Sequence, residues 1–257
     1  MEVRNTPPLD TARAEGIRCN YLHVLDSVRE CAVKYGRKPD EVRLMAVSKT
    51  VPAAEAAALL PIGSNAPYME HCSVLPPPLL LGENKVQELC QKADHFRSIG
   101  AEAEIHLIGH LQSNKAAIAA KSASMIQSVD SQRIASLLSA RASQYDRELP
   151  ILLEVNIGRD PAHFGFLPEE TESACAAIAA LPHLKLRGLM AVPPFTEDTV
   201  VTERCFADLR ELYEELGSTY RFDTLSMGMS GDYPLAIKHG STLVRVGTAI
   251  FGSRNVR

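Results

Sequence analysis

The chain has 257 residues and a formal net charge of −4, with 46% hydrophobic and 23% charged residues. This length suits one α/β barrel, so we expect residues 1–257 to form a single domain. No cluster of Lys and Arg resembles a nucleic-acid-binding face, and the longest apolar runs fall far short of the roughly 20 residues that span a bilayer. The polar first ten residues lack a signal-peptide core, which predicts a cytoplasmic protein without nucleic-acid or membrane partners.

The first predicted element is a helix over residues 11–35. Apolar residues from Ile17 to Ala32 recur at spacings of three and four residues and therefore share one face of this helix. Gly36 follows as a natural stop. We expect this face to pack against the remainder of the domain.

Short apolar or β-branched runs then alternate with alanine-rich stretches to the end of the chain. This alternation is typical of a parallel α/β fold. Strands are predicted at residues 43–49, 79–83, 105–110, 125–129, 151–156, 186–192, 224–227 and 243–251. Helices are predicted at residues 84–99, 113–121, 131–144, 168–180 and 202–216. Eight strands indicate a (β/α)8 TIM-type barrel.

Two regions depart from this regular alternation. Few residues follow the last predicted strand, so we expect no helix after it and expect the N-terminal helix to close the outer ring instead. Residues 63–78 contain Pro76, Pro77 and Pro78, which remove backbone donors and favour an extended chain. We therefore predict an extra exposed loop over residues 63–78.

Lys49 is the clearest candidate for chemistry. It follows Ser48 and the apolar residues 44–47, at the carboxyl end of the first predicted strand, where barrels place their active sites. Desolvation there lowers the pKa of an amine and frees its nitrogen to attack an aldehyde. Position alone also fits a lysine that extends from a strand end into solvent.

A second candidate site lies after the seventh and eighth predicted strands, where barrels commonly bind phosphate. Residues 224–231 read TLSMGMSG and residues 244–252 read VRVGTAIFG. Backbone N–H groups near glycines and side-chain hydroxyls could bind an anion there. The residues concerned are Ser226, Gly228, Ser230, Gly231, Gly247 and Thr248. Ordinary Gly/Ser turns are the alternative interpretation.

Other polar residues carry weaker signals. Arg245 lies within the last predicted strand, where a guanidinium needs a partner, and a buried structural ion pair is one interpretation. His106 and His110 would lie about 13 Å apart on one strand, too far to bind the same metal ion. The six cysteines form no C-x-x-C pair. We therefore predict no metal site.

Several segments together carry a family resemblance: RLMAVSKT, LLLGENKVQEL, IHLIGHLQSNK, ILLEVNIG, HFGF, LRGLMAVPPF and LSMGMSGDYPLAIKHGSTLVRVGTAIFG. Over residues 43–252 the chain resembles the pyridoxal phosphate homeostasis proteins, which look like the N-terminal barrel of alanine racemase. The resemblance implies pyridoxal 5'-phosphate (PLP) as the cofactor. It implies a cofactor-binding set of Lys49, Asn84, Ser226, Gly228, Ser230, Arg245, Gly247 and Thr248.

The resemblance also implies roles within this set. Lys49 would form the Schiff base with PLP, Asn84 would line the pocket, and the Ser, Gly and Thr residues would surround the phosphate. Arg245 falls where the related racemases place an arginine against the pyridine nitrogen. That arrangement keeps the nitrogen unprotonated and weakens the ring as an electron sink.

Three positions depart from the family pattern. Ile105 stands where the family usually has Trp, and Lys85 where many members have Tyr, but neither carries the covalent chemistry. Residues 63–78 replace a connection that is short in the family. They are either a true insertion or a gene-prediction artefact, and the mass of the protein from its native source would distinguish the two.

The resemblance implies a non-catalytic carrier that holds PLP and releases it to apo forms of PLP-dependent enzymes. A weak amino-acid racemase is the alternative function. Racemases need a second acid/base, which the relatives take from an additional domain and the partner subunit. No such domain follows before Arg257, so we expect a monomer without catalytic residues, although Tyr68 and Tyr233 fall in predicted loops near the barrel mouth. A sugar-phosphate enzyme on the same barrel is a third alternative, and it would bind phosphate without forming a Schiff base.

Overall fold

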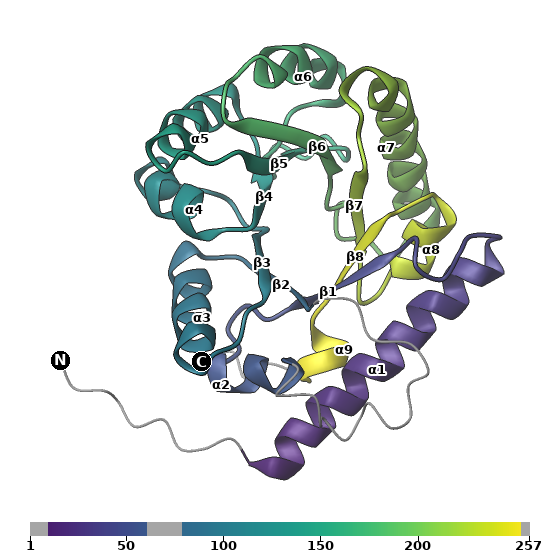
Figure 1. The fold of residues 1–257 in the computed structure, drawn as a ribbon. Coiled ribbons are helices and arrows are strands. Elements are labelled where there is room, and N and C mark those ends of the chain that lie inside the picture. The colour runs from purple at the N-terminus through teal and green to yellow at the C-terminus, as the bar shows by residue number, and fades with distance from the viewer. Residues whose placement is uncertain (1–9, 61–78, 253–257) are drawn as a thin grey trace.

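The computed structural model describes residues 10–60 and 79–252, and it contains a closed barrel of parallel strands in sequence order (Figure 1). The strands are β1 (Arg43–Val47), β2 (Leu80–Glu83), β3 (Glu104–Leu107), β4 (Met125–Val129), β5 (Leu149–Glu154), β6 (Leu184–Met190), β7 (Thr224–Met229) and β8 (Leu243–Val246). Pairing of Met45 on β1 with Arg245 on β8 closes the barrel. The predicted (β/α)8 TIM-type barrel is confirmed.

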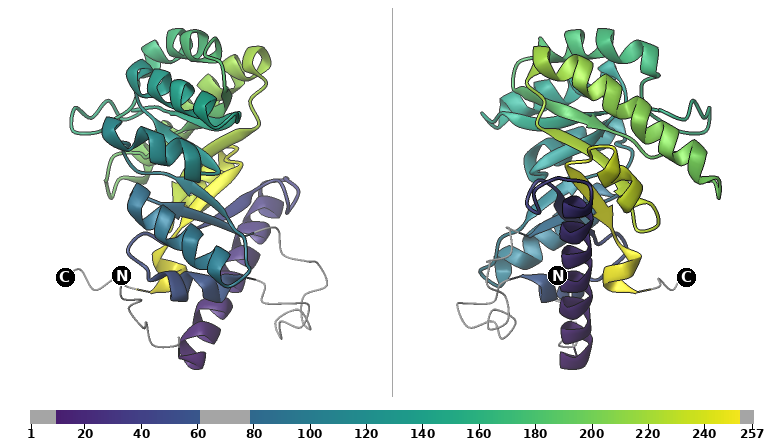
Figure 2. Two further views of the ribbon diagram at one scale, coloured as in Figure 1. Left: turned by 60° about the vertical axis from the view of Figure 1, so that its left-hand side comes forward. Right: turned by 90° about the vertical axis from the view of Figure 1, so that its right-hand side faces the viewer.

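Helices surround the barrel and cover the outer face of its sheet (Figures 1 and 2). The α-helices are α1 (Thr11–Lys34), α2 (Ala53–Ala56), α3 (Val86–Ser98), α4 (Ala116–Ser122), α5 (Gln132–Gln144), α6 (Thr171–Ala179), α7 (Thr199–Tyr220), α8 (Tyr233–Lys238) and α9 (Thr248–Phe251). Short 3-10 turns lie at η1 (Ala57–Leu59), η3 (Ser113–Lys115) and η4 (Pro168–Glu170). Among the described helices, none has both the length and the apolar character needed to cross a membrane.

The N-terminal helix α1 closes the outer ring, as predicted. It runs along the outside of the barrel and packs against α8, α9 and η1 (Figures 1 and 2). Its apolar face is buried, with Ile17 and Val28 fully enclosed. Polar contacts fix it to α9, because Arg13 Nη2 donates to the Phe251 carbonyl oxygen at 2.7 Å and Asn20 Nδ2 donates to the Ile250 carbonyl oxygen at 3.1 Å.

The predicted strand at residues 243–251 is correct only for its first residues, and the prediction that no helix follows the last strand was wrong. Strand β8 stops at Val246, and Thr248–Phe251 form the helix α9, where no helix was expected. The Gly247 carbonyl oxygen accepts hydrogen bonds from the N–H groups of Ile250 and Phe251, both at 3.0 Å, which turns the backbone into a helix. A short apolar run does not reveal by itself whether it is strand or helix.

The prediction that Tyr233 lies in a loop was also wrong, because Tyr233 is the first residue of α8. Pro234 follows in the first turn of this helix, where a missing backbone N–H costs nothing. The N–H groups of Leu235 and Ala236 bind the Asp232 carbonyl oxygen at 3.0 and 3.1 Å. Tyr68 and the predicted extra loop at residues 63–78 lie outside the described residues.

Candidate functional site

A pocket of about 430 Å³ lies at the carboxyl ends of the strands. Its volume is within the range of roughly 300–1,000 Å³ that small-ligand sites occupy. Its lining residues are Val47, Lys49, Asn84, Ile108, Val192, Met229, Ser230, Gly231, Arg245, Gly247 and Thr248. The carboxyl end of the barrel is also where enzymes and binding proteins of this fold place their sites.

The structure brings most of the predicted site residues to this pocket. Lys49, Asn84, Ser230, Arg245, Gly247 and Thr248 all line it. Ser226 and Gly228 are not among its lining residues. Ser226 is fully buried in the barrel interior. Gly228 has φ +93, and a Cβ atom there would lie 2.5 Å from the Ala236 Cβ, so this glycine allows α8 to pack closely on β7.

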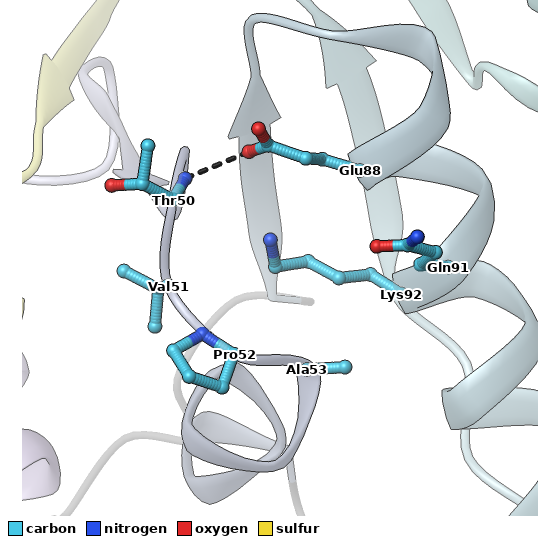
Figure 3. A pocket seen from close by; sticks show the side chains of 7 residues that line it. All are labelled: Thr50, Val51, Pro52, Ala53, Glu88, Gln91 and Lys92. Carbon is cyan, nitrogen blue, oxygen red and sulfur yellow. Dashed lines mark hydrogen bonds between the residues drawn. The ribbon is translucent and has the colours of Figure 1, made fainter. Parts of the chain in front are cut away.

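Lys49 lies just beyond the end of β1, half-buried, in a turn whose two neighbouring residues are both held by α3. Before it, the Ser48 carbonyl oxygen accepts a hydrogen bond from Lys92 Nζ at 3.0 Å. After it, the Thr50 N–H donates to Glu88 Oε2 at 2.7 Å (Figure 3). Thr50 has φ +64, a left-handed conformation that a non-glycine residue rarely adopts. Contacts on both sides therefore fix the backbone that carries Lys49.

Behind this turn lies a buried charged cluster that was not predicted from the sequence. Lys92 Nζ lies 2.8 Å from Glu83 Oε1, and both side chains are almost completely buried. Ser48 Oγ donates to the same carboxylate oxygen at 2.5 Å. Burial raises the pKa of Glu83, while the Lys92 charge acts in the opposite direction. The signal available in the sequence was Glu83 itself, a carboxylate two residues after the apolar run at residues 79–81.

Arg245 is 4% exposed and reaches the pocket from β8. Its Nη1 donates to Ser226 Oγ at 2.6 Å, and its Nη2 donates to the Ala191 carbonyl oxygen at 2.8 Å. Burial lowers the pKa of Arg245 to about 10, opposed by the charges of Glu154 and Asp232, so the guanidinium stays cationic at neutral pH. Within the described residues no carboxylate forms an ion pair with Arg245, so its contacts are with neutral acceptors.

The loops after β7 and β8 meet at the pocket. The Gly247 N–H donates to Ser230 Oγ at 3.4 Å, which links the two loops. Asp232 Oδ1 accepts from the Met229 N–H at 2.5 Å and holds the first of these loops. The hydroxyls of Ser230 and Thr248, together with nearby backbone N–H groups, supply hydrogen-bond donors on this side. Such donors suit a bound anion.

Apolar residues complete the pocket and were not predicted from the sequence. Val47, Ile108 and Val192 line it from the ends of β1, β3 and β6. Side chains of a strand alternate between its two faces, so residues two apart lie on the same face. Ile108 therefore continues the interior face that carries His106, and Val192 continues the face that carries Met190. The pocket therefore combines an amine, a buried cation, an anion-binding side and apolar walls, which suits a flat ring that carries an aldehyde and an anionic group.

Glu154 is a further unpredicted group, at the end of β5. Its Oε2 atom is buried without a hydrogen-bond partner in the described part of the chain. Burial, followed by repulsion from Asp130, raises its pKa from 4.5 to about 7, against the attraction of Arg245. The charge of Glu154 therefore changes close to neutral pH.

Comparisons with known proteins show the family that this chain resembles. Residues 79–255 match the family model described as alanine racemase, N-terminal domain. The chain is 39% identical to the pyridoxal phosphate homeostasis protein of Haemophilus influenzae over 238 residues, which cover 91% of this chain and 94% of the relative. It is 37% identical to the protein of the same name in Escherichia coli K12 over 241 residues, covering 92% and 96%.

Solved structures show the same similarity. PipY of Synechococcus elongatus with PLP bound superposes with a TM-score of 0.70 and 32% identity, covering 88% of this chain and all of PipY. A protein of unknown function from Bifidobacterium adolescentis gives a TM-score of 0.83 with 32% identity, covering 96% and 98%. Alanine racemase of Corynebacterium glutamicum, at 17% identity and a TM-score of 0.64, shares the fold over 95% of this chain and 62% of the racemase.

The first prediction concerns the buried pair next to Lys49. Replacing Lys92 with Met leaves the Glu83 carboxylate buried without its cation, which should lower the free energy of unfolding by about 3–5 kcal/mol. Urea unfolding measures this change, and Lys85→Met on the exposed end of α3 is the matched control. The double change Lys92→Met with Glu83→Gln should recover most of the loss. Equal stability of Lys92→Met and the wild type would contradict the assignment.

The second prediction concerns Glu154. The pKa of Glu154 in the folded state is raised from 4.5 to about 7. The contribution of neutral Glu154 to the free energy of unfolding is therefore fully present below pH 4.5 and is lost as the pH rises to about 7. Glu154→Gln should therefore gain stability relative to the wild type across this range, on the order of 3 kcal/mol at the alkaline end. Urea unfolding at a series of pH values measures the difference. A difference that does not change with pH would show that Glu154 ionises normally.

Proposed function

Because the chain belongs to the family of pyridoxal phosphate homeostasis proteins, whose barrel is the alanine racemase N-terminal domain, we propose that it binds PLP as a Schiff base on Lys49 and serves as an intracellular PLP carrier. One observation carries the proposal. Lys49, Arg245 and the donors around Ser230 line a single pocket at the carboxyl end of the barrel. The PLP-bound structure of PipY, a relative with 32% identity, supports it.

Each part of the pocket suits one part of PLP. Lys49 would hold PLP through its side-chain amine, whose nitrogen would form a C=N bond with the aldehyde carbon while the aldehyde oxygen is released as water. The Arg245 guanidinium, which only donates hydrogen bonds, would lie against the pyridine nitrogen and disfavour its protonation. Ser230, Gly247 and Thr248 would bind the phosphate. When bound, PLP supplies an electrophilic aldehyde and an electron-withdrawing ring.

The proposal favours storage over turnover. Racemisation needs an acid/base on each face of the bound substrate. The described lining of the pocket contains Lys49 but no Asp, Glu, His, Cys or Tyr that would serve as a second acid/base. Tyr233 belongs to α8 and does not line the pocket. In this proposal the protein is a cytoplasmic monomer that releases PLP to apo forms of PLP-dependent enzymes.

The central prediction is that Lys49→Ala abolishes covalent PLP binding. Wild-type protein incubated with PLP should show the absorption band of a protonated Schiff base. Borohydride reduction should then place the pyridoxyl mass on the peptide that contains Lys49. Lys85→Ala, an exposed lysine next to Asn84, is the matched control and should be labelled at Lys49 as the wild type is. Covalent labelling of Lys49→Ala to the wild-type extent would disprove the proposal.

The carrier role makes a separate prediction. The PLP-loaded protein should racemise alanine and serine no faster than free PLP does, because no second proton donor reaches the pocket from its described lining. Chiral chromatography of the amino acids after incubation measures this rate. The loaded protein should also activate an apo-enzyme that depends on PLP. Racemisation well above the rate of free PLP, lost in Lys49→Ala, would replace the carrier with a racemase.

A further inference from the structure

A chain of hydrogen bonds begins at the floor of the pocket and enters the barrel interior. Arg245 Nη1 donates to Ser226 Oγ at 2.6 Å, and Ser226 Oγ lies 2.7 Å from Gln127 Oε1. A guanidinium can only donate, so the Ser226 oxygen accepts from Arg245 and its own hydrogen is directed to Gln127. The acceptor on Gln127 must therefore be the amide oxygen. Arg245 thus determines the orientation of the next two groups.

The same logic extends to the opposite end of the barrel. With its oxygen toward Ser226, Gln127 presents its Nε2–H to His106 Nδ1 at 2.8 Å. His106 must then be unprotonated at Nδ1 and carry its hydrogen on Nε2, which lies 2.8 Å from Glu104 Oε1. Arg43 Nη2 donates to Glu104 Oε2 at 2.7 Å and ends the chain. Every hydrogen bond from Arg245 to Glu104 is donated in the same direction.

The pKa shifts of His106 and Glu104, at the end of the chain away from the pocket, agree with this assignment. Burial lowers the pKa of His106, against the attraction of Glu104, and the charges of Arg43 and Arg187 lower it further, so a neutral ring is expected. The hydrogen bond from His106 is the largest effect that lowers the pKa of Glu104, and the hydrogen bond from Arg43 lowers it further. Together they bring this pKa to about 2, although burial acts in the opposite direction. The chain therefore links a cation at the pocket to a carboxylate that stays ionised at the other end.

The chain crosses the barrel interior beside apolar side chains. Ser226, Gln127 and His106 are completely buried. The apolar side chains inside the barrel form two separate clusters, one around Met45 and Leu80 and one around Leu152 and Met190. Buried polar groups are costly unless each finds a partner, and here each member of the chain has one on either side. Such a continuous polar path fixes the side chains that belong to it.

We propose that Ser226, Gln127 and His106 are positioning residues that hold the Arg245 guanidinium by this one-directional chain and thereby set the electrostatic environment of the PLP ring. This inference rests on the proposed function. Arg245 contacts only neutral oxygens, from Ser226 and Ala191, so its charge is not cancelled by a contacting carboxylate and acts on the pocket. Gln127 and His106 do not line the pocket and act only through Ser226.

The test uses two variants that break the chain at different distances from PLP. Ser226→Ala removes the side-chain acceptor of Arg245 and leaves the Ala191 carbonyl oxygen in place. Gln127→Met removes both hydrogen bonds of the next member at similar volume. Ser128→Ala is the matched control, because Ser128 is equally buried but donates to the Gly109 carbonyl oxygen outside the chain. The measured quantity is the pH midpoint of the Schiff-base absorption of PLP-loaded protein.

Both chain variants should lower this midpoint by about half a pH unit or more, and Ser128→Ala should leave it unchanged. A loosened Arg245 no longer disfavours a proton on the pyridine nitrogen, and the added positive charge makes the Schiff-base nitrogen less basic. Ser226→Thr keeps the hydroxyl and should restore the wild-type midpoint. A Schiff base with the wild-type midpoint in both variants overturns the positioning role, whereas a wild type that forms no Schiff base disproves the proposed function itself.

A second measurement needs neither PLP nor a variant. Long-range proton–nitrogen NMR spectra of the apo protein, labelled with ¹⁵N at histidine, report which ring nitrogen carries the hydrogen. His106 should be neutral and protonated at Nε2 over about pH 6–8, set by its two partners. Protonation at Nδ1 in this range would reverse the chain and overturn the inference even where the variants fold poorly.

Discussion

The buried ion pair between Lys92 and Glu83 is the constraint on which the pocket depends. Glu83 precedes Asn84 at the end of β2, and Lys92 also binds the carbonyl group before Lys49. One pair of charges therefore ties α3 to the ends of two neighbouring strands. Removing such charges from water is expensive, so the cluster is stable only while its partners stay in place. The left-handed Thr50 persists because these contacts hold the turn on both sides.

Closure of the barrel then joins groups that are far apart in the sequence. Pairing of β1 with β8 brings the turn that carries Lys49 next to the strand that carries Arg245. Helix α1 covers this seam on the outside, and its hydrogen bonds to the carbonyl groups of α9 fix the short helix that begins at the pocket. The ends of the described chain thus support the site, although neither α1 nor the carbonyl end of α9 lines it.

The strands could be predicted because each forms a short apolar run between helices. Lys49 and Arg245 could be placed because they follow or lie in such runs, whereas Asn84 was expected only from the family resemblance. The boundary between β8 and α9 could not, since β-branched and apolar residues continue on both sides of Gly247 and only the backbone at this glycine separates the two elements. Ser226 was expected near a phosphate, yet its side chain is directed into the interior and binds Gln127. Lys92 and Gln127 look like ordinary surface residues in the sequence, and only tertiary packing buries them.

The distribution of charge explains why one pocket can favour an anionic ligand without a contacting cluster of basic residues. Arg245 is held by neutral acceptors, and Glu154 and Asp232 act on it without forming ion pairs within the described residues. The carboxylates of Glu154 and Asp232 therefore stabilise the guanidinium charge without contacting it, and no contacting carboxylate among the described residues neutralises this charge at the pocket. As the pH falls through about 7, Glu154 takes up a proton and withdraws part of that distant stabilisation. Arg245 and the carboxylates that act on it thus contribute to the electrostatic potential that a ligand on Lys49 would experience.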